Sequence, residues 1–327
     1  MNISGLGLWN WPLNAPEPPD SPRFPQFGHH AQRTTAVASA PASKPIPEKI
    51  KSSIGLSPIV QAFMVRVQEL EMMPLNGTDG NDRIRGWSGS LVDSGNGNDR
   101  IDVWSDSVVD GGAGNDSIRA WSGSVVYGGA GRDRIDVWSD SAVDGGSGND
   151  LIRSWSNSIV LGNAGDDVID AWSDSQVDGG AGDDQISAWS NSWVNGGAGN
   201  DRISASNNSA VDGGSGNDSI SVDNDSVASG GAGADTIYAD RGSTVLFDIG
   251  DGQDTVYAGR DVTLKLGAGL SAGNMQIAVS GNTATLSFGD GSDQITLHLG
   301  LGSPVTLAFA DGTTTEIGGA LHVLRGS

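Results

Sequence analysis

Hydrophobic and polar positions repeat every 17 residues between Gly77 and Leu246, through ten units without an insertion. After a glycine-rich stretch, even positions of each unit carry Ile, Ala or Val, Ser, Ser and Val, whereas odd positions carry mostly Arg, Asp or Trp. Such alternation is typical of strands with one buried face. Self-similarity at a fixed period predicts a solenoid in which each unit is one coil of two short strands and two turns. Its thin core is predicted to contain Ile101, Val108, Ile118, Val125 and their equivalents.

The segments that flank the repeat have different patterns. Nine of the twelve prolines lie in the first 47 residues, which predicts a disordered, Pro-rich arm over residues 1–50. In residues 51–76, apolar residues recur on one helical face between Ser57 and Pro74, so a short helix is expected to cover the end of the solenoid. Residues 261–327 are predicted to form a C-terminal β cap.

One turn of each unit reads Gly-Gly-x-Gly-x-Asp followed by x-Ile-x, as in residues 111–119. Glycines permit backbone conformations that turn several carbonyl oxygens toward one point, and the Asp adds a charged oxygen. Calcium prefers six to eight oxygen ligands, which is more than one such loop supplies. We therefore expect each ion to lie between two consecutive coils, in a column of about nine or ten calcium ions.

The predicted ligands follow from the positions in this motif. The side-chain ligands are the Asp at the sixth position of each unit and one further Asp after a longer step, namely Asp82, Asp99, Asp116, Asp133, Asp150, Asp167, Asp184, Asp201, Asp218, Asp235 and Asp254. The backbone ligands are the carbonyl oxygens of glycines at the second and fourth positions, namely Gly95, Gly97, Gly112, Gly114, Gly129, Gly131, Gly146, Gly148, Gly165, Gly180, Gly182, Gly197, Gly199, Gly214, Gly216, Gly231 and Gly233.

Charge and composition exclude several other classes of site and partner. The repeat holds 27 Asp and 9 Arg without Glu or Lys, so its net charge is 9 − 27 = −18. Ordinary metal-free Gly-Asp turns are the alternative, but carboxylates stacked about 5 Å apart would then oppose folding. Calcium binding and folding are therefore predicted to be one event. The absence of Cys excludes disulfides and thiolate zinc sites, and the net charge of −22 argues against nucleic acid and anionic membranes as partners.

This glycine-aspartate repeat resembles the RTX, or haemolysin-type calcium-binding, family over residues 77–260. The resemblance implies a right-handed parallel β-roll in which each nonapeptide forms half a coil. Here the second half-coil has eight residues, reads WSDSxVD or WSGSxVx and lacks a glycine pair, so a calcium column along one edge only is implied. The tail, with FDIGDGQDTV and ATLSFGDGSDQITL, is similar to the C-terminal β module of many secreted RTX proteins.

The same resemblance implies export through a type I secretion system with an uncleaved C-terminal signal. The sequence agrees with this, because Met1 to Trp11 lack the basic and apolar regions of a classical signal peptide. No segment reaches the roughly 20 apolar residues of a membrane span.

A second column is predicted on the outside of the solenoid, where Trp recurs every 17 residues at Trp87, Trp104, Trp121, Trp138, Trp155, Trp172 and Trp189. These indoles either bind sugars or other flat ligands, or stack on one another and shield a turn held by Ser hydroxyls. We favour stacking. Two residues before six of these Trp, Arg and Asp alternate from Arg85 to Asp170, which predicts attraction between neighbouring coils and a fixed register.

A catalytic site is not expected, because ten coils without an inserted loop leave no cleft wall, and no GxSxG or GK[ST] motif is present. His298 and His322 are expected at the surface of the tail. The leading hypothesis is a secreted, non-enzymatic calcium-binding β-roll that folds on binding calcium outside the cell. The alternatives are an adhesin that binds an extracellular glycan or cell surface with its Trp face, and an effector delivered through the Pro-rich arm.

Overall fold

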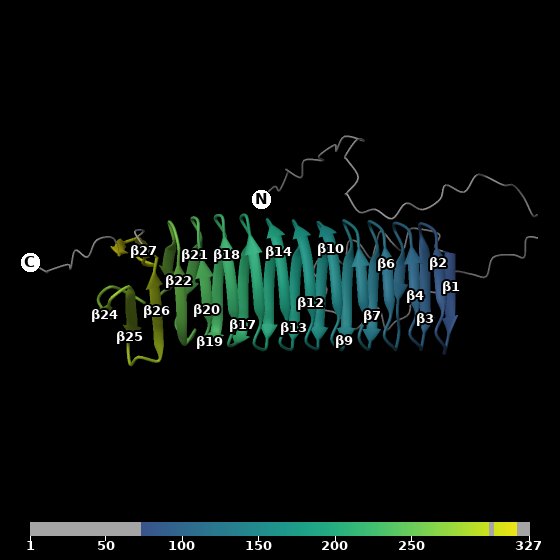
Figure 1. The fold of residues 1–327 in the computed structure, drawn as a ribbon, viewed down its shortest axis with the longest axis horizontal. Helices are drawn as coiled ribbons and strands as arrows, with labels where there is room; N and C mark the ends of the chain where they lie inside the picture. The colour runs from purple at the N-terminus through teal and green to yellow at the C-terminus, as the bar shows by residue number, and fades with distance from the viewer. Residues whose placement is uncertain (1–72, 301–303, 319–327) are drawn as a thin grey trace, which may run out of the picture. The chain divides into compact units, whose positions relative to one another are not determined.

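The computed structural model describes residues 73–300 and 304–318, and every regular element in these ranges is a β-strand. The strands alternate between two 14-stranded sheets, so that each coil contributes one strand to each sheet (Figure 1). Ile152 pairs in parallel with Ile135 on one side and Ile169 on the other, one 17-residue unit away in each direction. The prediction of an all-β, parallel solenoid of 17-residue coils is therefore confirmed.

The two sheets have the following strands. Sheet A consists of β1 (Met73–Thr78), β3 (Ser90–Gly95), β5 (Val108–Asp110), β7 (Val125–Ala130), β9 (Ala142–Ser147), β11 (Ile159–Ala164), β13 (Gln176–Ala181), β15 (Trp193–Ala198), β17 (Ala210–Gly216), β19 (Val227–Gly233), β21 (Thr244–Phe247), β23 (Thr263–Leu266), β27 (Val305–Ala308) and β28 (Thr314–Ile317). Sheet B consists of β2 (Arg83–Gly86), β4 (Arg100–Val103), β6 (Ser117–Ala120), β8 (Arg134–Val137), β10 (Leu151–Ser156), β12 (Val168–Ser173), β14 (Gln185–Ser190), β16 (Arg202–Ser206), β18 (Ser219–Asp223), β20 (Thr236–Ala239), β22 (Gln253–Ala258), β26 (Asp293–Leu299), β25 (Thr283–Phe288) and β24 (Met275–Ser280).

The core lies between the sheets and is built from the Ile at the eighth and the apolar residue at the sixteenth position of each unit, such as Ile118 and Val126. Val108 and Val125 are also buried, but they form a separate small cluster outside this core. Consecutive side chains of a strand point to opposite faces, and Val109 and Val126 take the inward positions. The prediction that Val108 and Val125 lie in the main core was therefore wrong, and the next residues, Val109 and Val126, lie there instead.

The solenoid begins earlier than the sequence predicted. Residues 73–76, expected at the end of a capping helix, belong to strand β1, which pairs in parallel with β3. Leu75 pairs with Val92 and packs against the core, and this pairing favours a strand over a helix here. Pro74 is tolerated because β1 is the edge strand of sheet A among the described residues. The rest of the predicted helix and the Pro-rich arm lie outside the described residues.

The C-terminal segment extends both sheets. Strand β26 pairs in parallel with β22, and β27 with β23, so the described part of the predicted cap adds one more coil. Antiparallel strands then complete the sheets, with β25 and β24 after β26 and with β28 after β27.

One buried side chain has a hydroxyl that makes no hydrogen bond, and replacing this residue is predicted to stabilise the protein. The Ser154 hydroxyl is buried without a hydrogen-bond partner, between Val137 and Ala171 in the neighbouring coils. An unsatisfied buried hydroxyl costs about 1–3 kcal/mol, so Ser154→Ala should raise the melting temperature at saturating calcium. The control is Ser158→Ala, which removes a hydroxyl that donates to the Ser156 carbonyl (3.1 Å). This variant should lower the melting temperature. A lower melting temperature for Ser154→Ala would contradict the assignment.

Candidate metal centre

The predicted Asp column is present and buried. From Asp99 to Asp254, the side chains at the sixth position are at most 2% exposed. Each Oδ1 accepts the backbone N–H of the aspartate one coil earlier, as in the bond from Asp99 to Asp116 (2.7 Å). Asp254 accepts from Asp235 (3.1 Å), so the column continues across the step of 19 residues that separates these two.

The second carboxylate oxygen of each aspartate in this column lacks a partner. In the described part of the chain, Oδ2 of all ten aspartates from Asp99 to Asp254 is buried without a hydrogen bond. Asp82 in the first unit differs, because its Oδ2 accepts the backbone N–H (2.6 Å) and the hydroxyl (2.8 Å) of Thr78. A buried, unpaired carboxylate oxygen is costly unless a cation lies beside it. Its repetition at one place in ten coils is therefore the observation that fits a metal column.

The first glycine of each motif brings oxygens of two coils together. A Cβ at Gly111 would lie 2.8 Å from Asp116 Oδ2 and against the carbonyl oxygen of Gly128 in the next coil. A Cβ at Gly128 would likewise lie 2.6 Å from Asp133 Oδ2 and against the carbonyl oxygen of Gly145. A carboxylate and a carbonyl from consecutive coils thus face the same point, as cross-coil binding requires. The sequence prediction omitted these first-position carbonyls, although nine of the ten units have glycine there.

The glycines that were predicted as backbone ligands occupy the turns of this edge. Those at the second and fourth positions have positive φ, except Gly233, so they need the conformational freedom of glycine. The Gly95 carbonyl already accepts the N–H of Ala113 (3.0 Å), and the Gly112 carbonyl that of Ala130 (2.8 Å). Their role as calcium ligands stays a prediction.

A second ladder beside the Asp column connects the coils in the opposite direction. At the fifth position, the Asn98 side-chain oxygen accepts the backbone N–H of Asn115 in the following coil (2.7 Å), and Asn149 does the same for Asp166 (3.1 Å). Arg132 interrupts this ladder because its side chain has no acceptor. The fifth and sixth positions together fix the spacing of the coils at this edge.

Main-chain oxygens are essential to any metal site at this edge. Within residues 73–300 and 304–318, no group of three or more Asp, Glu, His or Cys side chains could hold a metal ion by itself. Carboxylate and carbonyl oxygens are the ligands that calcium prefers, and the column offers both. The donor set therefore fits calcium.

Burial raises the pKa of the column aspartates from Asp116 to Asp254. The pKa of Asp116, Asp150, Asp184, Asp218 and Asp254 rises from 3.8 to about 7, and that of Asp133 and Asp167 to about 6. The largest cause is desolvation, which the backbone hydrogen bond to each Oδ1 partly offsets. For Asp116, the charges of Asp99 and Asp133 raise the pKa further. Without metal, the fold thus favours the protonated form.

Comparison with known proteins agrees with this geometry. A family model described as the RTX calcium-binding nonapeptide repeat matches residues 75–101, 104–135, 124–141, 154–186, 173–192, 188–220 and 212–246. Residues 75–246 are RTX repeats. Among solved structures, the extracellular lipase LipA from Serratia marcescens is similar at 18% identity and a TM-score of 0.15, over 71% of this chain. The chain spans only 39% of that lipase. No curated protein matches this chain.

The raised pKa values predict how pH acts on the RTX repeats. Between about pH 4 and 7 the folded, calcium-free state binds more protons than the unfolded state, so its stability falls as pH rises through this window. In chelator, β-structure should therefore be greater at about pH 5 than at pH 8. Calcium requires ionised carboxylates, so its affinity for the folded coils should fall as pH falls below about 7. Circular dichroism in chelator tests the first trend and calorimetric calcium titration between about pH 5 and 8 tests the second, and values independent of pH would contradict them.

The opposite edge of the RTX coils is held by serine. At the fourteenth position, the backbone N–H of Ser107 donates to the hydroxyl of Ser124 (3.3 Å), and this pattern repeats from Ser90 to Ser226. The Ser107 hydroxyl in turn donates to the Trp104 carbonyl (2.8 Å). These hydrogen bonds join the coils without metal, which agrees with a calcium column along one edge only.

The Trp column of the RTX repeats is also present, and its rings stack. Ring centroids of successive indoles are 4.7–6.4 Å apart. Trp121, Trp138 and Trp155 in the middle are half-buried, whereas the terminal Trp87 and Trp189 are 71% and 59% exposed. This arrangement favours the interpretation of the column as a packed ladder.

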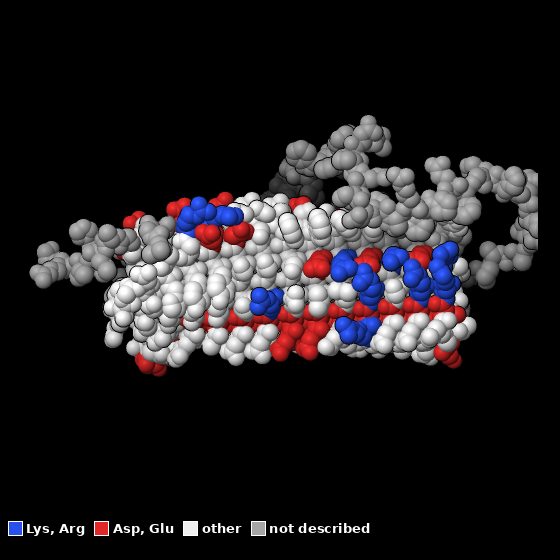
Figure 2. Space-filling model, in the orientation of Figure 1, with Lys and Arg blue, Asp and Glu red and all other residues white. Residues whose placement is uncertain are grey.

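The alternating Arg and Asp residues lie in register beside the Trp column. Asp102 pairs with Arg85 and Arg119 in the neighbouring strands, and it forms ion pairs with both (3.9 and 3.8 Å). Figure 2 shows basic side chains gathered over the N-terminal coils, with acidic side chains in a long row beside them. The predicted attraction between coils is therefore confirmed for Asp102.

In the described ranges, no helix is long and apolar enough to cross a membrane.

Proposed function

We propose that this protein is a secreted, non-enzymatic calcium-binding β-roll whose RTX repeats fold when they bind calcium outside the cell. The observation that carries the proposal is the column of ten buried Asp Oδ2 atoms without a hydrogen-bond partner in the described residues. Calcium outside cells reaches the concentrations to which extracellular modules are tuned, whereas calcium in the cytosol lies far below them. The chain would then stay unfolded before export and fold after it.

The residues that would hold calcium come from consecutive coils. The sixth-position aspartates would supply Oδ2, as Asp116 does, and first-position glycines such as Gly128 would supply the carbonyl oxygen that faces it. Bound calcium supplies positive charge, which offsets the desolvation of the carboxylates and their mutual repulsion. Each ordered coil would present half of the next site, so binding is expected to be cooperative.

Secretion and the lack of enzymatic activity are part of the same proposal. RTX repeats support secretion, and the similar lipase from Serratia marcescens is described as extracellular. The described coils have no inserted loop between residues 77 and 246 that would form a cleft wall, which supports a structural role. The Trp ladder supports packing between coils more than attachment to a surface, because successive indoles cover one another's faces.

Calorimetric titration of the full-length protein tests the proposal by counting ions. The eleven aspartates from Asp82 to Asp254 enclose ten gaps between coils, so about nine or ten calcium ions should bind cooperatively. The Asp150→Ala variant is a useful comparison, because it should lose the site to which the unpaired Asp150 Oδ2 atom belongs. A count near twenty would mean that the serine edge also binds metal, and a count of one or two would refute the column.

A further inference from the structure

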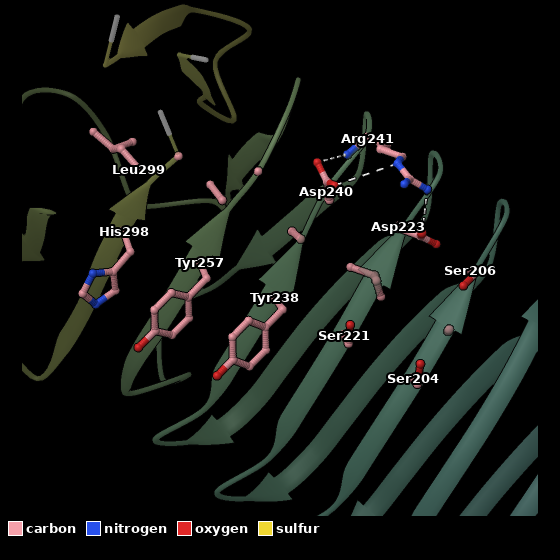
Figure 3. A pocket seen from close by; sticks show the side chains of 16 residues that line it. Ser204, Ser206, Ser221, Asp223, Tyr238, Asp240, Arg241, Tyr257, His298 and Leu299 are labelled. Carbon is pink, nitrogen blue, oxygen red and sulfur yellow. Dashed lines mark hydrogen bonds and ion pairs between the residues drawn. The ribbon is translucent and has the colours of Figure 1, made fainter. Parts of the chain in front are cut away.

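Where the Trp column ends, the same face of sheet B opens into a groove of about 590 Å³ (Figure 3). The eleventh position, occupied by Trp up to Trp189, is Ser206, Asp223 and Asp240 in the next three coils. Gly259 follows at the corresponding place, and all of these side chains are much smaller than an indole. The groove therefore lies where four indoles would otherwise continue the ladder.

One wall of the groove is aromatic. Tyr238, Tyr257 and His298 stand in register on β20, β22 and β26, with ring centroids 4.8 and 4.5 Å apart and ring planes within 9° of parallel. On its other side Tyr238 is paired with Ser221, whose side chain is too short to cover a ring. Figure 3 shows Ser221 and Ser204 in front of this ring. Tyr238 is 47% exposed, so it presents one free ring face to the groove.

The other wall is polar and balanced in charge. Arg241 Nη1 lies 3.3 Å from Asp223 Oδ2, and Asp240 Oδ1 accepts the backbone N–H groups of Arg241 (2.9 Å) and Arg260 (2.7 Å). The carboxylates of Asp223 and Asp240 and the guanidinium of Arg241 line this side, and the guanidinium of Arg260, outside the lining, pairs with Asp240 (3.9 Å). Asp223 Oδ1 is buried and has no hydrogen-bond partner in the described part of the chain. This oxygen does not face the groove, but the Asp223 side chain as a whole is 34% exposed, so the rest of its carboxylate can be contacted by a ligand.

These features define the chemistry of an occupant. A free aromatic face flanked by hydrogen-bonding groups suits a pyranose ring, which has an apolar face of C–H groups and hydroxyls at its edge. The hydroxyls of Ser204 and Ser221 and the Asp223 carboxylate are available to those hydroxyls. Because the four charged groups balance one another, nothing in the wall selects a charged ligand. We propose that this groove binds a neutral saccharide, through the free face of Tyr238 and the partly exposed carboxylate of Asp223.

The proposal does not depend on the role of calcium beyond the need for folded coils, and it differs from binding along the Trp column. It is tested on the full-length protein in saturating calcium, by calorimetry with cellohexaose, maltohexaose, xylohexaose and mannohexaose as probes. At least one probe should bind. Tyr238→Ala should weaken this binding about tenfold. Tyr238→Phe keeps the ring face and should retain the affinity.

Two further variants separate the groove from other causes. Asp223→Asn should weaken binding while the calcium-induced circular dichroism spectrum stays unchanged. Trp87→Ala, at the far end of the Trp column, should leave binding unchanged. The proposal is wrong if none of the four probes binds at millimolar concentration, if Tyr238→Ala binds like the unmodified protein, or if Trp87→Ala weakens binding equally. Tighter binding of sulfated than of neutral saccharides would also overturn it.

Discussion

Full-length protein in excess chelator is expected to lose the β-sheet circular dichroism of its coils and to regain it when calcium is added. The reason is electrostatic, because the repeat has a net charge of −18 and ten of its carboxylates are buried with one oxygen unpaired. Without a cation, the serine ladder and the thin core must offset this cost alone. The expected change includes most of the spectrum, since the parallel coils contain 25 of the 28 described strands, all except β24, β25 and β28.

Magnesium is the control for this experiment. It prefers near-octahedral geometry at about 2.0–2.1 Å and gives up its water reluctantly, so it should restore the spectrum poorly at the concentration at which calcium restores it fully. A β-sheet spectrum that persists unchanged in chelator at pH 8 would show that the column does not need metal.

The second large effect is expected from Gly131→Ala, at the fourth position of the motif. Gly131 has φ 132°, and a Cβ there would overlap the backbone carbonyl of Gly114 in the preceding coil. This contact is between main chains, so it cannot be relieved without separating two coils. The substitution should cost about 3 kcal/mol or more, seen as a lower melting temperature at saturating calcium.

Gly289→Ala is the matched variant. Gly289 also has a positive φ, 57°, but a Cβ there meets nothing within 4 Å. It should cost only about 1 kcal/mol, the usual penalty for Ala in the left-handed region. Equal losses for the two variants would mean that backbone strain alone, and not close contact between coils, makes the glycines necessary.

The sequence predicted the repeat well because a solenoid depends on contacts between equivalent positions. Once the unit length is known, Asp116 must lie beside Asp99 and Asp133, and Trp121 beside Trp104 and Trp138. The predictions failed where the neighbour was not a repeat. The sequence of residues 73–76 predicted the end of a helix. Their pairing with β3 stabilises a strand by more than the local preference for a helix.

Two features of the sites could not be predicted for other physical reasons. His298 stacks on Tyr257 (4.5 Å), although 40 residues, including strands β24 and β25, lie between the two, so no period connects them. The predicted backbone ligands included the second and fourth glycines of the motif but not the first. Gly111 lies close to Asp116 Oδ2 because of how consecutive coils pack on each other, which residue type alone does not reveal.

Calcium is proposed to lie between consecutive coils along the Asp edge, and anomalous scattering from crystals of the calcium-loaded protein would locate the ions. We predict one row of anomalous peaks, each about 2.3–2.6 Å from the Oδ2 atom of a sixth-position aspartate such as Asp116. The serine edge, at Ser107 and its equivalents, should carry none. Peaks along the serine edge, or a fully folded Asp column without peaks, would contradict the account.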